Sequence, residues 1–382
     1  FWNNRISGTL DFYWNTTKDL LMQTDIPSNT GYEDQYQNFG KTSNKGIEFA
    51  VNAVLVDKKN FGLNFNFNIA YNKNKIEELN TSSPWQSSNW SGSTISEYED
   101  FRVEAGGALG EIWGYKVDGI YTAYDPATGT GDLIFQNGAW QFADGRKDNS
   151  STKFGALMPG GIKLQVDENG APIKQRLGNT IPTTTGGFGF DGRVGNFDFN
   201  VFFNYSLGNK IVNGTKLATS FRAGSSQNYN LVADFNVDNR YTWIDPNTGM
   251  NIGNPLTATI NAYGGIENIY ARLNEINAGR TLWNPASATK MVLLDWAVED
   301  ADFLRVQNIT VGYTLPKKWV KALYLENVRI YFTGYNLFCF TGYDGYDPEV
   351  DTSSKKNPMC PGVDYAAYPK SRTFVGGINV TF

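Results

Sequence analysis

Apolar and polar residues alternate along several long segments of this chain. From residue 61 the sequence reads FGLNFNFNIAYN, so Phe61, Phe65 and Tyr71 share one face with three other apolar residues, while the opposite face is mostly asparagine. The same period of two recurs at 5–14, 47–55 and 197–207, where Phe202 is the one apolar residue on the polar face. Alternation of this length predicts β-strands with one apolar and one polar face.

The composition of the two faces favours a transmembrane barrel. The polar faces carry mainly Asn, Thr, Ser and Gly and few Lys or Glu, whereas the solvent face of a soluble sheet usually carries more charge. The apolar faces are rich in Phe and Tyr, which suits contact with lipid. A soluble β-sandwich is the alternative that this pattern leaves open.

Turn lengths predict how the strands are oriented. Asp57–Asn60 and Arg193–Asn196 are tight polar turns, whereas about a hundred residues separate Leu79 from Ile181 and a second long stretch separates Ile211 from Phe303. Short turns on one side and long loops on the other are typical of outer-membrane barrels, with the short turns in the periplasm.

The last segments complete the predicted strand count. The segment Pro316–Asn327 is expected on the periplasmic side, and the final strand is expected at Arg372–Phe382. Counting up and down gives at least eight crossings, with a possible further pair at Glu111–Tyr121.

Composition then excludes several classes of function. The 382 residues carry a formal net charge of −5 without a basic cluster, so no surface for nucleic acid is predicted. Histidine is absent, which removes the commonest general acid–base residue and metal ligand, and we expect no enzyme, cofactor or metal. No apolar run reaches the roughly 18 residues of a membrane helix. The mean hydropathy of −0.40 is compatible with alternating strands. Because the chain opens on Phe1, we expect further residues upstream in the gene product.

Six ordered segments resemble the C-terminal part of SusC-like (RagA-like) TonB-dependent outer-membrane transporters of Bacteroidetes. They are NRISGTLDFYWNTTKDLL from Asn4, NFGKTSNKGIEF from Asn38, IWGYKVDGIY from Ile112, ADFLRVQNITVGYTLPKKW from Ala301, VRIYFTGYNLFCFTGYDGYDPEV from Val328 and AYPKSRTFVGGINVTF from Ala367. The segments roughly at 80–109 and 215–288 fall where that family has divergent exterior loops.

The resemblance implies an all-β fold in the outer membrane of a Gram-negative cell. Residues 1–382 would supply about 8–10 antiparallel strands of a barrel of roughly 22, with the plug domain and N-terminal strands absent from this chain. It also implies TonB-dependent import of a bulky nutrient, a glycan as the first guess and a peptide as the second. The implied partners are a SusD-like surface lipoprotein, the TonB complex through the missing N-terminal region, the remainder of the barrel and membrane lipid. Two alternatives stay open: a non-transporting structural subunit of an outer-membrane complex, and a soluble carbohydrate-binding β-sandwich.

Two short motifs resemble ligand-binding motifs but are better explained by local backbone structure. Gly187–Gly192 fits the G-x-G-x-x-G pattern of dinucleotide sites, but an alternating strand follows it where a helix is required, so we interpret the glycines as easing a bent strand. Asp167–Gly170 resembles the start of a calcium loop, yet Ala171 and Pro172 replace later ligand positions, which favours a solvated turn.

The candidate site residues are aromatic side chains in the exterior loops and the two cysteines. Aromatic faces stack on sugar rings while neighbouring Asp and Asn bind hydroxyls, although packing of the loops on one another is the alternative for each. Cys339 and Cys360 are expected near the exterior side, as a disulfide or as two thiols. The candidate substrate-binding residues are Trp85, Trp90, Tyr98, Tyr241, Trp243, Tyr343 and Tyr346.

Overall fold

One antiparallel sheet of eight long strands forms the main wall of the molecule. A computed structural model describes residues 2–3, 5–25, 31, 34–38, 40–79, 85–87, 99–222, 230–322, 324–352 and 359–382. In spatial order the wall consists of β1 (Ile6–Thr17), β4 (Gly40–Lys58), β5 (Phe61–Leu79), β14 (Thr184–Val194), β15 (Phe197–Leu207), β18 (Phe303–Thr314), β19 (Asn327–Thr341) and β21 (Thr373–Thr381). The predicted alternation and the last strand are therefore confirmed.

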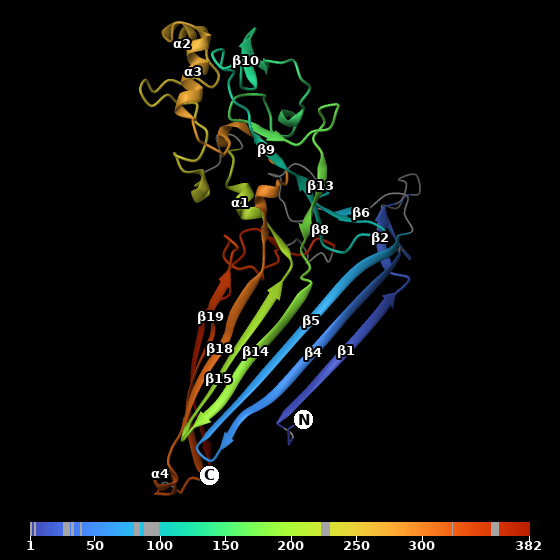
Figure 1. Ribbon diagram of the computed structural model, residues 1–382, viewed down its shortest axis with the longest axis vertical. Coiled ribbons are helices and arrows are strands. Elements are labelled where there is room, and N and C mark those ends of the chain that lie inside the picture. Colours follow the sequence, from blue (N-terminus) through green and yellow to red (C-terminus); the bar gives the residue numbers. More distant parts are fainter. Residues whose placement is uncertain are drawn as a thin grey trace.

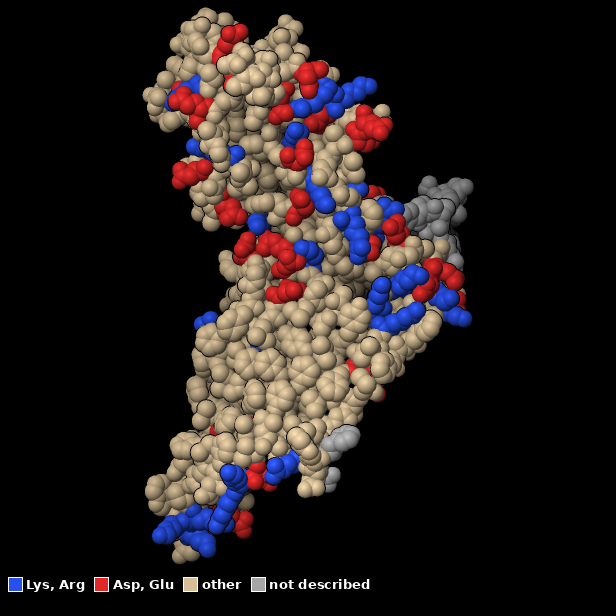
Figure 2. All heavy atoms as spheres, viewed as in Figure 1, with Lys and Arg blue, Asp and Glu red and all other residues tan. Residues whose placement is uncertain are grey.

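The register between the strands aligns their apolar residues into rows across one face of the wall. Phe67, Phe188 and Phe203 are partners on three neighbouring strands, and the rings of the last two stack with centroids 4.7 Å apart. Exposed fractions reach 71% at Phe12 and 61% at Phe374, so this face is open and is not packed against a second sheet. The β-sandwich alternative is thereby wrong. Figure 2 shows the corresponding feature on the surface, a band nearly free of charge between charged groups at the two ends of the strands.

The opposite face of the wall is polar and hydrogen-bonded across strands. Asn308 donates to Asn200 at 2.7 Å, and the hydroxyls of Thr310 and Thr333 lie 2.9 Å apart. Phe202, the predicted exception, lies on this face over the glycines of β14, where a Cβ at Gly187 would meet its ring at 2.6 Å. The glycine run therefore makes room for an aromatic ring within a strand, and β15 follows it directly.

The connections differ between the two ends of the wall as predicted. Tight turns join β4 to β5 and β14 to β15, and a short helix, α4 (Lys317–Ala322), lies between β18 and β19. Figure 1 shows α4 and both chain ends at one end of the strands, and the long connections gathered at the other. We call these long connections, residues 80–183, 208–302 and 342–372, the exterior body.

The exterior body contains short strands and helices of its own. The first connection carries β6 (Trp85–Ser87), β7 (Phe101–Val103), β8 (Glu111–Tyr115), β9 (Val117–Ile120), β10 (Leu133–Gln136), β11 (Ala139–Phe142), η2 (Ser150–Lys153), β12 (Ile162–Leu164) and β13 (Lys174–Asn179). The second carries β16 (Lys210–Asn213), α1 (Gly214–Ala218), η3 (Ala233–Phe235), α2 (Thr257–Ala262), α3 (Ile266–Ile276), η4 (Pro285–Ser287), η5 (Asp295–Ala297) and β17 (Val298–Asp300). The third carries β20 (Val363–Asp364), and a hairpin of β2 (Leu21–Asp25) and β3 (Asp34–Asn38) follows β1.

The possible further pair of crossings at Glu111–Tyr121 is not part of the wall. Its residues form β8 and β9, which pair with β13 and β12 in small sheets of the exterior body. The N–H of Tyr115 instead donates to the carbonyl of Leu293 at 2.9 Å, which ties β8 to the second connection. Among the described residues, no helix combines the length and apolar composition that crossing a membrane requires.

Candidate substrate-facing surface of the exterior body

The exterior body is held together by two hydrophobic clusters. The first cluster joins all three long connections and has the fully buried Phe101, Phe221 and Trp283 among its members. In the second cluster α3 places Ile269 and Leu273, one helical turn apart, against β10 and β11. The long connections therefore form a folded layer with a core, which can hold binding residues in fixed positions.

A buried ion-pair network fixes the third connection to the wall. Arg305 of β18 is 3% exposed and donates to Asp347 at 2.7 Å and to Glu349 at 2.8 Å. Lys370 also contacts Glu349 at 2.8 Å. Near this network the hydroxyl of Tyr343 donates to Asp364 at 2.7 Å.

A second cationic centre joins the second and third connections. The buried Lys216 of α1 lies 3.1 Å from Glu299 and 3.2 Å from Asp344, and its ammonium lies 4.7 Å from the Trp296 ring. These neighbours raise the pKa of Lys216 although burial opposes them. Both networks stabilise the exterior body, and neither leaves its cation free for a ligand.

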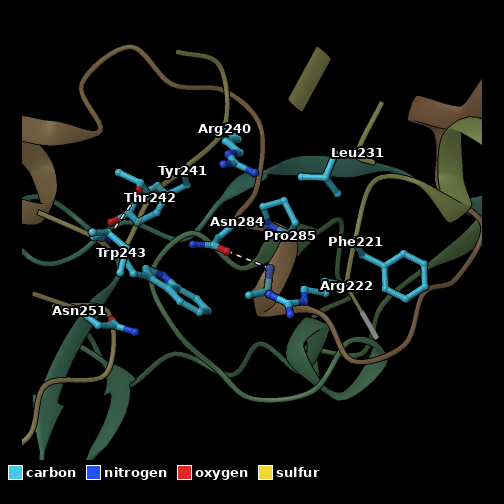
Figure 3. Close-up of a pocket in the computed structure, with 12 residues that line it drawn as sticks. Phe221, Arg222, Leu231, Arg240, Tyr241, Thr242, Trp243, Asn251, Asn284 and Pro285 are labelled. Carbon is cyan, nitrogen blue, oxygen red and sulfur yellow. Dashed lines mark hydrogen bonds between the residues drawn. The ribbon is translucent and has the colours of Figure 1, made fainter. Parts of the chain in front are cut away.

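The cavity drawn in Figure 3 lies within the second connection and has a volume of about 570 Å³. Asn284, Pro285 and Ala286, at the end of the segment 282–286, line it. On one side of this segment the N–H of Arg222 donates to the Pro285 carbonyl at 2.9 Å, and on the other the N–H of Tyr241 donates to the Leu282 carbonyl at 2.8 Å. Arg222 and Arg240 are thus held on opposite sides of one segment. The cavity is lined by Phe221, Arg222, Leu231, Arg240, Tyr241, Thr242, Trp243, Ile244, Asn251, Asn284, Pro285 and Ala286.

A buried carboxylate fixes the hairpin that carries Trp243 and Asn251. Arg272 of α3 donates to both oxygens of Asp245, at 2.7 and 3.1 Å, and the Tyr263 hydroxyl donates at 2.5 Å. The bonds from Arg272, followed by that from Tyr263, hold the pKa of Asp245 well below its usual range. Asp245 therefore stays ionised and anchors this edge of the cavity to α3.

The structure distributes the predicted aromatic residues among different environments. Trp243 lines the cavity beside Tyr241, whose ring is 2% exposed and belongs to the second cluster, and burial raises the pKa of the Tyr241 hydroxyl. Tyr343 is buried in contact with Asp364, whereas Tyr346 is 76% exposed. Among the predicted aromatic residues whose side chains are described, Tyr241 and Trp243 are the two that share one cavity. The described residues include the backbone of Trp85 in β6 but neither its side chain nor Trp90 and Tyr98, so these three predictions lie outside them.

The remaining sequence motifs have structural roles. Asp167 accepts hydrogen bonds from the N–H groups of Asn169 and Ala171 at 2.8 and 2.9 Å, which makes it the cap of a turn. No group of three potential metal ligands occurs among the described residues. Cys339 and Cys360 do not form the possible disulfide: Cys339 is exposed at the exterior end of β19, and Cys360 is buried in the first cluster.

Comparison with known proteins agrees with this architecture. A family model described as TonB dependent receptor-like, beta-barrel, matches residues 1–156. TonB-dependent receptor P3 of Formosa agariphila is 28% identical over 384 residues, which cover 100% of this chain and 33% of the relative. TonB-dependent receptor SusC of Bacteroides thetaiotaomicron is 26% identical over 396 residues, covering 100% of this chain and 31% of SusC. The chain thus spans about a third of the length of these curated relatives.

Solved structures share the fold. A structure of the RagAB peptide importer in its open-open state matches all of this chain and 33% of its own, with a TM-score of 0.63 at 19% identity. Its closed-closed state gives a TM-score of 0.64 at 20% identity and covers 100% of this chain and 34% of its own.

The wall and these matches define an outer-membrane β-barrel protein. Residues 1–156 match the β-barrel of TonB-dependent receptors, and the whole chain is similar to about a third of receptors of that kind, SusC among them.

Proposed function

We propose that the receptor containing this chain imports a bulky nutrient across the outer membrane, a glycan first and a peptide second. The observation that carries this proposal is the combination of a lipid-facing wall with a folded exterior body that presents a lined cavity. The relatives are receptors and transporters, and we expect no covalent chemistry on the nutrient.

The proposal includes the rest of the transporter. Residues 1–382 act as one part of the barrel, and the plug domain and the remaining strands lie elsewhere in the polypeptide. The outer edges of β1 and β21, at the two ends of the sheet order, support this arrangement because they are the positions where further strands would pair. An antibody against this chain is expected to detect an outer-membrane polypeptide about three times its 42.5 kDa. A band at 42.5 kDa alone would refute that arrangement.

In this proposal, partner proteins supply the energy for import and capture the nutrient. The TonB complex moves the plug, and a SusD-like surface lipoprotein delivers the nutrient from outside. The resemblance to SusC and to RagAB supports both partners. Co-purification of the intact receptor with a surface lipoprotein tests the second partner directly.

Uptake by intact cells tests the import function. Cells with the receptor gene should accumulate a fluorescent oligosaccharide of the cognate nutrient, and accumulation should stop when the receptor or TonB is deleted. A labelled peptide tests the second substrate class in the same assay. A receptor whose deletion changes no uptake, but disperses an outer-membrane complex, would instead be a structural subunit.

A further inference from the structure

Positive charge without a carboxylate partner marks the cavity beside Trp243. Arg222 and Arg240 both line it, and neither forms an ion pair with a described carboxylate. The described lining contains no Asp or Glu. In a chain with net charge −5, this is a local excess of cationic groups.

The two asparagines of the cavity add further hydrogen-bond donors. The amide oxygen of Asn284 accepts from the N–H of Ala286 at 2.9 Å, and that of Asn251 accepts from the N–H of Gly253 at 3.0 Å. Each oxygen already accepts one backbone N–H, whereas neither NH₂ group donates to a described residue, so these side chains offer a ligand mainly donors. Figure 3 shows the nitrogen of Asn284 directed toward Trp243.

Trp243 supplies a flat apolar surface in the same cavity. Its indole N–H donates to the Pro159 carbonyl at 2.7 Å, and its ring packs against Gly253, where a Cβ would lie only 2.1 Å from the ring. The ring is therefore fixed in position, and Figure 3 shows it projecting toward the cavity. Such a ring face suits the apolar C–H face of a sugar.

We infer that this cavity binds an acidic oligosaccharide, with separate carboxylates or sulfates of the chain held by Arg222 and by Arg240 and a sugar ring stacked on Trp243. Guanidinium groups bind such oxyanions through charge-assisted hydrogen bonds, and the asparagine donors suit acceptor-rich ligands. A volume of about 570 Å³ has room for a short stretch of sugar rings. This inference deepens the proposed import function, on which it rests, by naming the charge class of the substrate.

Calorimetry on the intact purified receptor in detergent tests the site. The probes are a tetragalacturonate, its methyl ester, a sulfated galactan tetrasaccharide and an acidic tetrapeptide. We expect at least one acidic oligosaccharide to bind about tenfold or more tighter than the neutral ester, with an affinity that falls as salt is added. R222Q/R240Q should reduce that affinity to the level of the ester, whereas K290Q, at an exposed lysine of the same connection outside the cavity, should not.

The possible outcomes distinguish failure of the cavity site from failure of the import function. Equal binding of the ester and both acidic oligosaccharides, or no binding of any of them, overturns the site. Arginine-dependent binding of the peptide alone overturns the oligosaccharide assignment. TonB-dependent uptake of a neutral glycan that R222Q/R240Q leaves unchanged overturns the site while import stands. Arginine-dependent binding of an acidic oligosaccharide without uptake supports the site and refutes the import function.

Discussion

The wall and the exterior body place their apolar residues in opposite directions. In the wall, Phe12 and Phe374 point outward and polar side chains bond to each other across the inner face. In the exterior body, Phe221 and Trp283 are fully buried and the surface carries the charge. The difference teaches that the two regions of one chain are adapted to two environments. Lipid acyl chains contact the apolar face of the wall, so that face needs no protein core. In the exterior body, apolar side chains are buried away from water in the usual way.

The largest expected effect is on the core of the exterior body. Trp283→Ala removes a fully buried indole whose N–H donates to the Ser220 carbonyl at 3.0 Å, and should lower the local free energy of unfolding by about 3–5 kcal/mol. Hydrogen exchange on the intact receptor should show faster exchange in the exterior body and unchanged exchange in the wall. The control Trp319→Ala, at a ring 61% exposed on α4, should change neither. Unfolding of the wall together with the exterior body would contradict the separation of the two regions.

The junction between the regions should be nearly as sensitive. Arg305→Met leaves Asp347 buried without its cation, and a broken buried pair costs about 3–5 kcal/mol. Exchange should increase at 342–352 before it increases in β18. Lys370→Met removes a partly exposed partner of the same network and should cost less than about 1 kcal/mol. Equal effects of the two substitutions would show that the network contributes through exposed charge alone.

Placing an arginine on either face of the wall tests which face contacts lipid. Phe65→Arg places a guanidinium on the lipid-facing side of β5, beside Phe190 at 5.1 Å between ring centroids, and should cost about 2–4 kcal/mol near the bilayer midplane. Asn66→Arg on the adjacent, inward-facing position should cost much less. Urea unfolding in liposomes, followed by heat-modifiable gel migration, measures both. A larger loss for Asn66→Arg would reverse the assignment of the faces.

The wall was predictable from sequence because its determinants are local. A period of two in FGLNFNFNIAYN fixes which residues share a face, and the tight turn at Asp57–Asn60 fixes its pairing with β4. The cavity was not predictable, because Arg222 and Arg240 come to line it through long-range hydrogen bonds of Arg222 and Tyr241 with segment 282–286. Spacing also could not show that Tyr343 is a core residue while Tyr346 is exposed. The sequence signal that pointed to the cavity was the pair of aromatic residues Tyr241 and Trp243.

The smallest expected effect is a pH response that differs between two buried carboxylates of the exterior body. The pKa of Asp245 is lowered in the folded state, so its stabilising contact with Arg272 is complete above the unfolded value of about 4 and is lost only as pH falls through the folded pKa. Burial, followed by the charges of Asp347 and Glu299, raises the pKa of Asp364 although Tyr343 donates to it. Ionised Asp364 therefore destabilises the folded state, and this destabilisation disappears as pH falls through its folded pKa. Hydrogen exchange, corrected for the intrinsic pH dependence, should slow around β20 on acidification toward pH 4 and stay constant around Asp245. Asp364→Asn should abolish the change at β20, and a parallel response of both sites would contradict the opposite pKa shifts.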